Sequence, residues 1–171
     1  VQHHLVSHGV NVSSVPMRDP VSVTMHVKAT PERVYALVSD LPRMGEWSPE
    51  CYRCRWMGDV QQARPGARFK GWNRIGIRRW TTKGTIVTAE PPKEVSFDIH
   101  SVFDLPVARW TYRITPDGNG GCDVTEAWAD RRGGVMKLLG NVASGVTDRA
   151  AHNTDGMQKT LQRIKETAES S

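Results

Sequence analysis

The sequence is poor in cysteine and contains no long apolar run. It has three cysteines among 171 residues. So low and odd a number, without a signal peptide, indicates free thiols in a reducing compartment. No apolar run approaches the ~18 residues that a membrane-spanning helix needs, and the mean hydropathy is −0.49. Because residues 1–15 also lack the charged start and apolar core of a secretory signal, we expect a cytoplasmic protein without membrane insertion.

The chain also lacks the usual patterns of a redox, zinc or phosphate site. Cys51 and Cys54 form a C-x-x-C pair, but the pair enters a predicted strand instead of opening a helix, where the helix dipole would lower a thiol pKa. A zinc ion would need two further ligands, and no second C-x-x-C is present. The glycine-rich residues 117–121 join two predicted strands, so they indicate a hairpin turn and not a phosphate-binding loop.

The histidines do not form a recognisable catalytic or metal-binding pattern. Three of them lie in a segment that we interpret as a tail: His3, His4 and His8. His26 falls on the polar side of the first predicted strand. His100 and His152 are isolated, so we place them on the surface or in loops. We expect no metal and no cofactor.

Acidic residues are rare in one stretch of the chain. Between Arg53 and Lys83 there are nine basic residues and one acid, Asp59, and the formal net charge of the chain is +5. An anionic partner such as single-stranded nucleic acid would explain this excess, with a basic strip made of Arg53, Arg55, Arg68, Lys70, Trp72 and Arg74. A solvated outer face of a sheet explains it more simply, because strand alternation places these side chains together. We therefore expect no nucleic-acid partner.

What the sequence does contain is a regular succession of predicted strands and turns. Residues 21–27 alternate apolar and polar side chains, which is typical of a strand with one buried face. Turn-forming residues separate six further predicted strands, at residues 52–58, 67–73, 79–89, 94–101, 108–115 and 122–130. Consecutive strands with short turns predict an antiparallel meander.

Helices are predicted before and after the six-strand series. Thr30 suits the cap and Pro31 the first turn of a helix that ends near Asp40, and a second short helix covers residues 43–47. Residues 131–145 are predicted to form a looser segment. A long helix follows at about residues 146–168. Its apolar face becomes small and polar toward the N-terminal half, along the series Ala168, Ile164, Leu161, Met157, Thr154, Asn153 and Ala150.

This order of elements predicts an α+β fold. A sheet that is apolar on one face must bury that face, and the long helix is the only partner large enough to cover it. We therefore expect a curved antiparallel sheet of about seven strands around the C-terminal helix, with two short helices after the first strand. The domain covers residues 18–171 and follows an irregular tail at residues 1–17.

Several segments resemble a known family. Residues 30–42 and 47–50 resemble the opening of START-related domains of the SRPBCC superfamily. Residues 66–73 and 78–82 are similar to its actinobacterial polyketide cyclase/dehydrase-like branch, and the resemblance extends over about residues 21–167. It implies a helix-grip fold and a START-like ligand-binding domain. Because the superfamily includes aromatase/cyclases, lipid carriers and hormone receptors, the resemblance indicates the fold more specifically than the function.

Strand alternation assigns side chains to the inside of the predicted sheet. This inner face is largely aromatic, and the same alternation turns Tyr52, Cys54 and Trp56 inward. From the inner face and the facing helix we predict a set of ligand-binding residues: Trp80, Thr82, Phe97, Ile99, Trp110, Trp128, Asn153 and Met157. An aromatic face closed by a partly polar helix is typical of a ligand cavity.

Three polar residues on the inner face are candidates for catalytic chemistry: Glu126, Tyr112 and Asn73. A carboxylate on an apolar face is costly to bury. Glu126 is therefore either a cavity acid with a raised pKa or a structural partner of Tyr112, Arg109 or a backbone amide. Tyr112 either donates a proton or simply packs, and Asn73 either orients a ligand oxygen or bonds to a turn.

Two functions are consistent with these observations. The first is a binding module for a hydrophobic small molecule (a lipid, a polyketide or an aromatic compound), as a monomer or a homodimer. The second is an aromatase/cyclase-like enzyme in which Glu126, Tyr112 and Asn73 transfer protons and stabilise an enolate. For such an enzyme the resemblance implies an arginine in the pocket, but alternation places Arg109 and Arg113 on the outer face, where they give no match.

Overall fold

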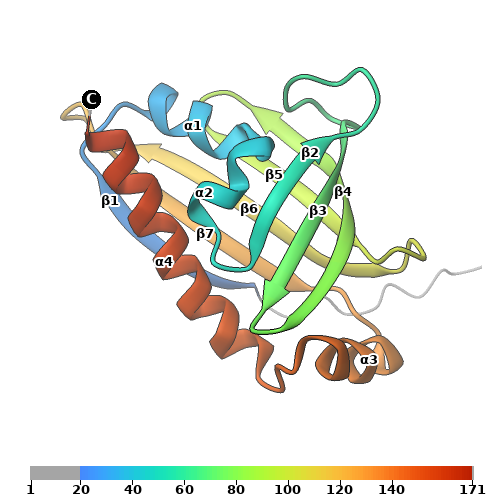
Figure 1. Ribbon diagram of the computed structural model, residues 1–171. Coiled ribbons are helices and arrows are strands. Elements are labelled where there is room, and N and C mark those ends of the chain that lie inside the picture. The colour runs from blue at the N-terminus through green and yellow to red at the C-terminus, as the bar shows by residue number, and fades with distance from the viewer. Residues whose placement is uncertain (1–19, 171) are drawn as a thin grey trace, which may run out of the picture.

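The computed structural model describes residues 20–170, which form a curved sheet wrapped around a long helix (Figure 1). The expected irregular tail, residues 1–17, lies outside the described residues. The strands are β1 (Val21–Val27), β2 (Cys51–Trp56), β3 (Arg68–Ile75), β4 (Arg78–Glu90), β5 (Glu94–His100), β6 (Pro106–Pro116) and β7 (Cys122–Asp130). The helices are α1 (Pro31–Ser39), a 3₁₀ turn η1 (Leu41–Arg43), α2 (Met44–Trp47), α3 (Gly134–Ser144) and α4 (Arg149–Glu169).

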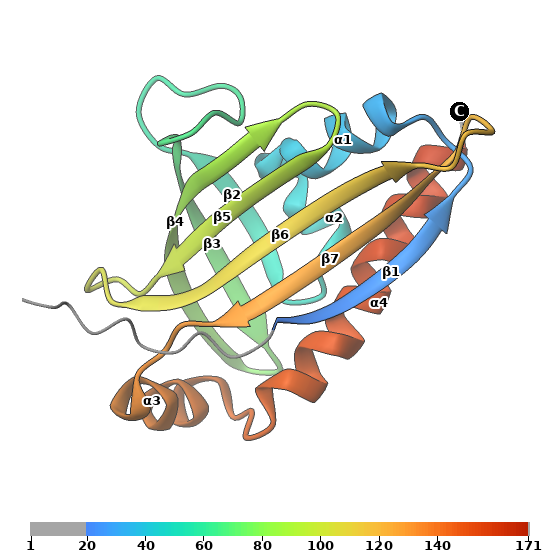
Figure 2. The same ribbon diagram turned by 180° about the vertical axis from the view of Figure 1, so that it is seen from behind.

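The seven described strands form one antiparallel sheet in the order β1-β7-β6-β5-β4-β3-β2. Strands β2 to β7 make the expected meander, since each pairs with the next along the chain. β1 instead pairs with β7, with Val23 opposite Glu126. Figure 2 shows the convex outer face of this sheet, with α4 behind β1. The sheet therefore has one open, concave side, and the α+β helix-grip fold expected from the sequence is confirmed.

Helix α4 crosses the concave side and buries the apolar face that the sequence predicts. Met157, Leu161 and Ile164 are almost completely buried, and the helix packs mainly on β1. Arg33 of α1 holds the last turn of α4, because its Nε donates to the carbonyl oxygen of Ala168 at 2.7 Å. Within residues 20–170 no helix is both long enough and apolar enough to cross a membrane.

Helix α3 departs from the sequence-based expectation. The looser segment predicted at residues 131–145 is wrong, because most of it forms this helix. The apolar residues have helical spacing, but Val135, Leu138 and Val142 face the solvent, so no buried stripe accompanies that spacing. Glycines within and beside the segment also lower its helix propensity. The helix ends at Gly145, which adopts a left-handed conformation with φ of 74°.

The beginning of β2 also differs from simple alternation. The pairing register between β2 and β3 shifts between Cys51 and Arg53, so Tyr52 forms a β-bulge. Tyr52 is 41% exposed, and its ring contacts the guanidinium of Arg74 at 5.6 Å. The expected inward position of Tyr52 is therefore wrong. As a consequence, both Cys51 and Cys54 face the concave side.

The basic residues of β2 and β3 lie on the outer face, as alternation predicts. They surround the ring of Trp72, where the guanidinium of Arg53 lies 4.8 Å from the ring centroid, that of Arg55 lies at 5.4 Å, and the ammonium of Lys70 lies at 5.2 Å. Cations of this kind interact favourably with the electron-rich face of an indole. This arrangement separates the basic charge from the concave side of the sheet.

Candidate functional site

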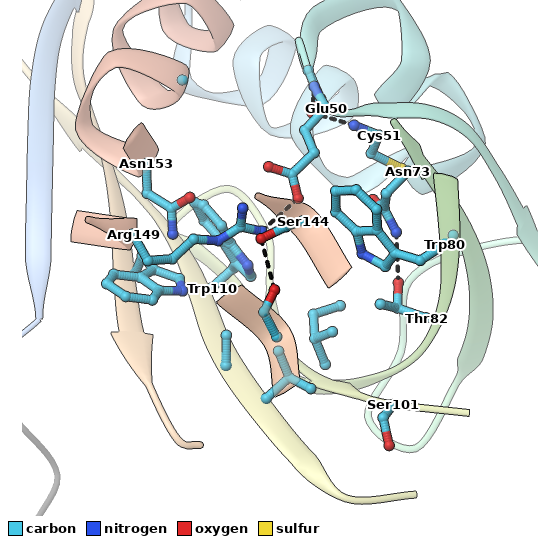
Figure 3. Close-up of a pocket in the computed structure, with 18 of the residues that line it drawn as sticks. Glu50, Cys51, Asn73, Trp80, Thr82, Ser101, Trp110, Ser144, Arg149 and Asn153 are labelled. Carbon is cyan, nitrogen blue, oxygen red and sulfur yellow. Dashed lines mark hydrogen bonds and ion pairs between the residues drawn. The ribbon is translucent and has the colours of Figure 1, made fainter. Parts of the chain in front are cut away.

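A cavity of about 440 Å³ lies between the concave face of the sheet and the helices α3 and α4. Its walls come from β2 to β7, from α4 and from the segment between α2 and β2. The loop at residues 101–105 and the inner side of α3 border one end of it. Figure 3 shows side chains from these separate elements converging on the same space. The cavity is therefore a product of the whole fold.

All eleven side chains proposed from the sequence line this cavity. They are Asn73, Trp80, Thr82, Phe97, Ile99, Trp110, Tyr112, Glu126, Trp128, Asn153 and Met157. Strand alternation predicts the inward side chains of the middle strands correctly. The reason is that each strand pairs with its neighbours without a register shift at these residues. The structure places these side chains on the cavity wall, and their roles in binding or catalysis stay predictions.

Two phenylalanine rings of the apolar wall, Phe69 and Phe97, pack against each other, and Trp56 packs against Phe69 from outside the cavity lining. Phe69 meets Phe97 edge to face with a centroid distance of 5.4 Å, and Trp56 meets Phe69 in the same way at 6.1 Å. Phe69 lies across Gly84 of β4, where an added Cβ would come within 2.0 Å of the ring. Gly84 is therefore the residue that allows this ring to line the cavity.

Glu126 and Tyr112 form a buried polar pair on the floor of the sheet. They face each other across β6 and β7, and the Tyr112 hydroxyl donates to Oε1 of Glu126 at 2.7 Å. Glu126 is only 4% exposed and Tyr112 only 2%. Burial raises the pKa of Glu126 to about 8, against the opposing effect of the tyrosine hydrogen bond. Burial also raises the pKa of Tyr112 well above its usual value.

The state of Glu126 follows from this environment. With a pKa of about 8, the carboxyl group is mostly protonated and neutral at pH 7. Oε1 is held by Tyr112, while the buried Oε2 has no hydrogen-bond partner among the described residues. Of the two interpretations made from the sequence, the structure combines both. Glu126 is a partner of Tyr112, and it is also an acid with a raised pKa on the cavity wall, whereas its role toward a ligand stays a prediction.

Asn73 lies on a second part of the wall. Its Nδ2 donates to Oγ1 of Thr82 at 3.2 Å, so it bonds to a neighbouring strand and not to a turn. An added Cβ at the adjacent Gly71 would lie 3.1 Å from the same Thr82 oxygen. The Asn73 and Thr82 side chains therefore orient each other within the cavity wall.

A charged cluster at the cavity was missed by sequence reasoning. Nη2 of Arg149 donates to Oε1 of Glu50 at 2.6 Å, and Nε2 of His152 lies 3.1 Å from Oε2 of the same carboxylate. All three residues line the cavity, which corrects the expected surface or loop position of His152. Arg149 is thus an arginine on the cavity wall that comes from the start of α4 and not from a strand.

Local hydrogen bonds fix the two chain segments that carry Glu50 and Arg149. Ser48 Oγ accepts from the backbone amides of Glu50 and Cys51, at 3.2 and 2.9 Å, and so fixes the chain before β2. Asp148 caps α4 by accepting from the amide of Ala151 at 3.0 Å. Helical spacing then puts Arg149 and Asn153 on one face. Only this spacing was visible in the sequence, since Glu50 is distant along the chain.

The two cysteines of the C-x-x-C pair line the cavity without forming a disulfide. Burial raises the pKa of Cys51 to about 11 and that of Cys54 to about 12. Such thiols are protonated at neutral pH and are therefore poor nucleophiles and metal ligands. Within residues 20–170, no cluster of three or more histidine, cysteine or acidic side chains is placed to hold a metal ion.

Comparisons with known proteins agree with this architecture. A family described as polyketide cyclase / dehydrase and lipid transport matches residues 19–169, so the chain belongs to this family. No curated protein matches the chain. Among solved structures, a polyketide-cyclase-like protein of Corynebacterium glutamicum is 28% identical, with a TM-score of 0.56 over 90% of this chain and 94% of that one.

Two more distant structures share the fold. One is the two-domain aromatase/cyclase of the steffimycin biosynthetic pathway, 16% identical, with a TM-score of 0.63 over 88% of this chain and 51% of that one. The other is the major latex-like protein 151 of Panax ginseng, 12% identical, with a TM-score of 0.65 over 88% and 97% of the two chains. At these identities the likeness concerns the helix-grip fold alone.

Proposed function

We propose that this protein binds a hydrophobic small molecule in the cavity between the sheet and α4. The observation that carries the proposal is the cavity itself, about 440 Å³ in volume and lined mainly by aromatic and aliphatic side chains. Small-molecule sites commonly have a volume of ~300–1,000 Å³ and combine apolar walls with a few polar groups. Membership of a family of cyclases and lipid-transport proteins supports the same conclusion.

The distribution of polar groups supports one bound molecule in a defined orientation. Glu126 lies on β7 at the floor of the sheet, whereas Arg149 lies at the start of α4. The aromatic side chains of Trp80 and Trp110 line the same cavity. A ligand with an apolar body and oxygen substituents at separate positions would satisfy all of these groups.

The three free cysteines support the further proposal that the protein acts in the reducing cytoplasm.

The test of binding is a pair of tryptophan substitutions on α3. Ala143 lines the cavity, while the adjacent Val142 does not and is 70% exposed. We expect native mass spectrometry of the purified protein to detect a co-purifying apolar molecule. We expect Ala143→Trp to reduce this occupancy and Val142→Trp, which places the same indole ring outside the cavity, to preserve it. A protein that stays empty and shows no thermal shift with a panel of lipids and aromatic compounds would contradict the proposal.

A catalytic function on a polyketide is the second candidate, and Glu126 is the observation that favours it. An intramolecular aldol closure moves a proton from the attacking carbon to the carbonyl oxygen. A neutral Glu126 would give its proton from Oε2 to that oxygen as the carbon–carbon bond forms, and the carboxylate so produced would take up the proton that the attacking carbon loses, which regenerates the acid. Tyr112 would then act as a positioning residue through its bond to Oε1.

The corresponding experiment measures turnover of a poly-β-ketone substrate. We expect Glu126→Gln to abolish the reaction while ligand binding persists, because glutamine keeps the shape but cannot transfer a proton. Tyr112→Phe should reduce the rate and shift its pH profile, since it removes the hydrogen bond to Oε1. Equal turnover in Glu126→Gln and the unmodified protein would refute the catalytic role of this residue.

A further inference from the structure

Arg149 carries a buried guanidinium nitrogen, Nη1, at the cavity wall. Nη2 is bonded to Glu50, but the buried Nη1 has no hydrogen-bond partner among the described residues. The side chain is 18% exposed and lies over the ring of Trp80 at 6.0 Å. Burying an N–H donor of a charged group without a partner is costly. Its position on the cavity wall points to a partner that enters the cavity.

A second donor stands beside it on the same helix. Asn153 follows Arg149 by one turn of α4 and lines the cavity, although it is only 5% exposed. Figure 3 shows both side chains in the cavity, and no hydrogen bond joins the carboxamide of Asn153 to another residue drawn there. The end of the cavity near the start of α4 therefore presents two adjacent polar side chains toward the ligand space.

The other charged groups of the cavity wall are already engaged or neutral. Arg132 binds both carboxylate oxygens of Asp130, at 2.9 Å each. Glu50 is shared between Arg149 and His152, and Glu126 is mostly protonated at neutral pH. Glu50 reaches only Nη2 of Arg149 and its second oxygen contacts His152, so neither carboxyl group on the wall is hydrogen-bonded to Nη1.

We propose that the ligand is a hydrophobic acid whose carboxylate binds Nη1 of Arg149 and the carboxamide of Asn153. This inference rests on the proposed binding function and adds the chemical class of the ligand. A guanidinium N–H forms stronger hydrogen bonds with an anionic oxygen than with a neutral one. The aromatic and aliphatic walls bind the apolar remainder of the acid, and Trp80 shields the ion pair from water.

The experiment compares each acid with its matched alcohol. The probes are dodecanoic acid with dodecan-1-ol, and 2-naphthoic acid with 2-naphthalenemethanol, titrated into the unmodified protein at pH 7 and followed by tryptophan fluorescence. We expect at least one acid to bind about tenfold or more tightly than its alcohol, as for a charge-assisted hydrogen bond. The aliphatic and aromatic pairs distinguish a fatty acid from an aromatic acid.

Variants of α4 then assign the preference to Arg149. We expect Arg149→Gln to lower the affinity for the acid far more than the affinity for the alcohol, so that the preference for the acid disappears. Lys159→Gln is the matched control, because it removes one positive charge from the exposed side of the same helix, where Lys159 pairs with Asp155. If Arg149→Gln does not fold, the double variant Glu50→Gln/Arg149→Gln removes the whole ion pair and serves instead.

The outcomes separate this inference from the function on which it rests. If alcohols bind as tightly as their acids to the unmodified protein, the acid class is wrong while the binding function stands. If the acid preference persists without Arg149, the assignment to this residue is wrong. If neither acids nor alcohols bind, both the proposed function and this inference fail.

Discussion

Replacing Glu126 by glutamine should change how the stability of this protein depends on pH. In the folded protein the pKa of this carboxyl is about 8, whereas its ordinary value is 4.5. Below pH 4.5 the group is protonated in both states and carries no ionisation penalty. Between pH 4.5 and about 8 the unfolded chain loses its proton and the folded protein keeps it. Stability therefore falls as the pH rises through this range.

The magnitude follows from the difference between the two pKa values. At ~1.36 kcal/mol per pH unit, the full difference amounts to about 5 kcal/mol above pH 8, and to about 3 kcal/mol at pH 7. Glutamine preserves the acceptor for Tyr112 and has no proton to lose. The free energy of unfolding of Glu126→Gln, relative to that of the unmodified protein, should therefore rise by about 5 kcal/mol between pH 4 and pH 9.

Urea denaturation at a series of pH values measures the effect. Other groups titrate in the same range, but they contribute equally to both proteins and cancel in the difference. Glu46→Gln is a suitable control, because Arg43 holds the pKa of that exposed carboxyl below its usual value, so its effect is confined to acidic pH. If the curves of Glu126→Gln and the unmodified protein run parallel from pH 4 to pH 9, Glu126 is not buried as a neutral acid.

Three further predictions concern packing, thiol chemistry and the outer face. Gly84→Ala should lower the free energy of unfolding by about 1–3 kcal/mol, because the added methyl overlaps the ring of Phe69; unchanged stability in urea would contradict this close approach. Cys51 and Cys54, with raised pKa values of about 11 and 12, should react with iodoacetamide at pH 8 far more slowly than in the urea-unfolded chain; equal rates would show that they are not buried. Asp98→Asn should cost about 1–3 kcal/mol at neutral pH, since Asp98 accepts hydrogen bonds from two arginines. The pKa of Asp98 is lowered, so this cost should disappear as the pH falls through that lowered value, and a cost that persists in acid would refute the ionic explanation.

The middle of the sheet shows why the inner face of the cavity was predictable. In β6 and β7 each residue faces its partner in regular register, and the period of two sends Trp110, Tyr112 and Glu126 to one side. The same reasoning fails at Tyr52, because a bulge adds one residue to β2 and reverses the side to which that ring points. A bulge leaves no consistent mark in the pattern of apolar and polar residues, so the sequence alone could not reveal it.

The sequence by itself determined the strands, the long helix and the aromatic inner face, because each depends on local propensity and on a short repeat of apolar residues. The tertiary structure decided which distant polar groups meet. Glu50 and Arg149 are separated by 99 residues, and no periodicity relates them. Their contact depends on how the chain before β2 and the start of α4 pack at the same end of the cavity. The pKa of Glu126 was likewise decided by burial, since the same residue in an exposed strand would titrate near its ordinary value.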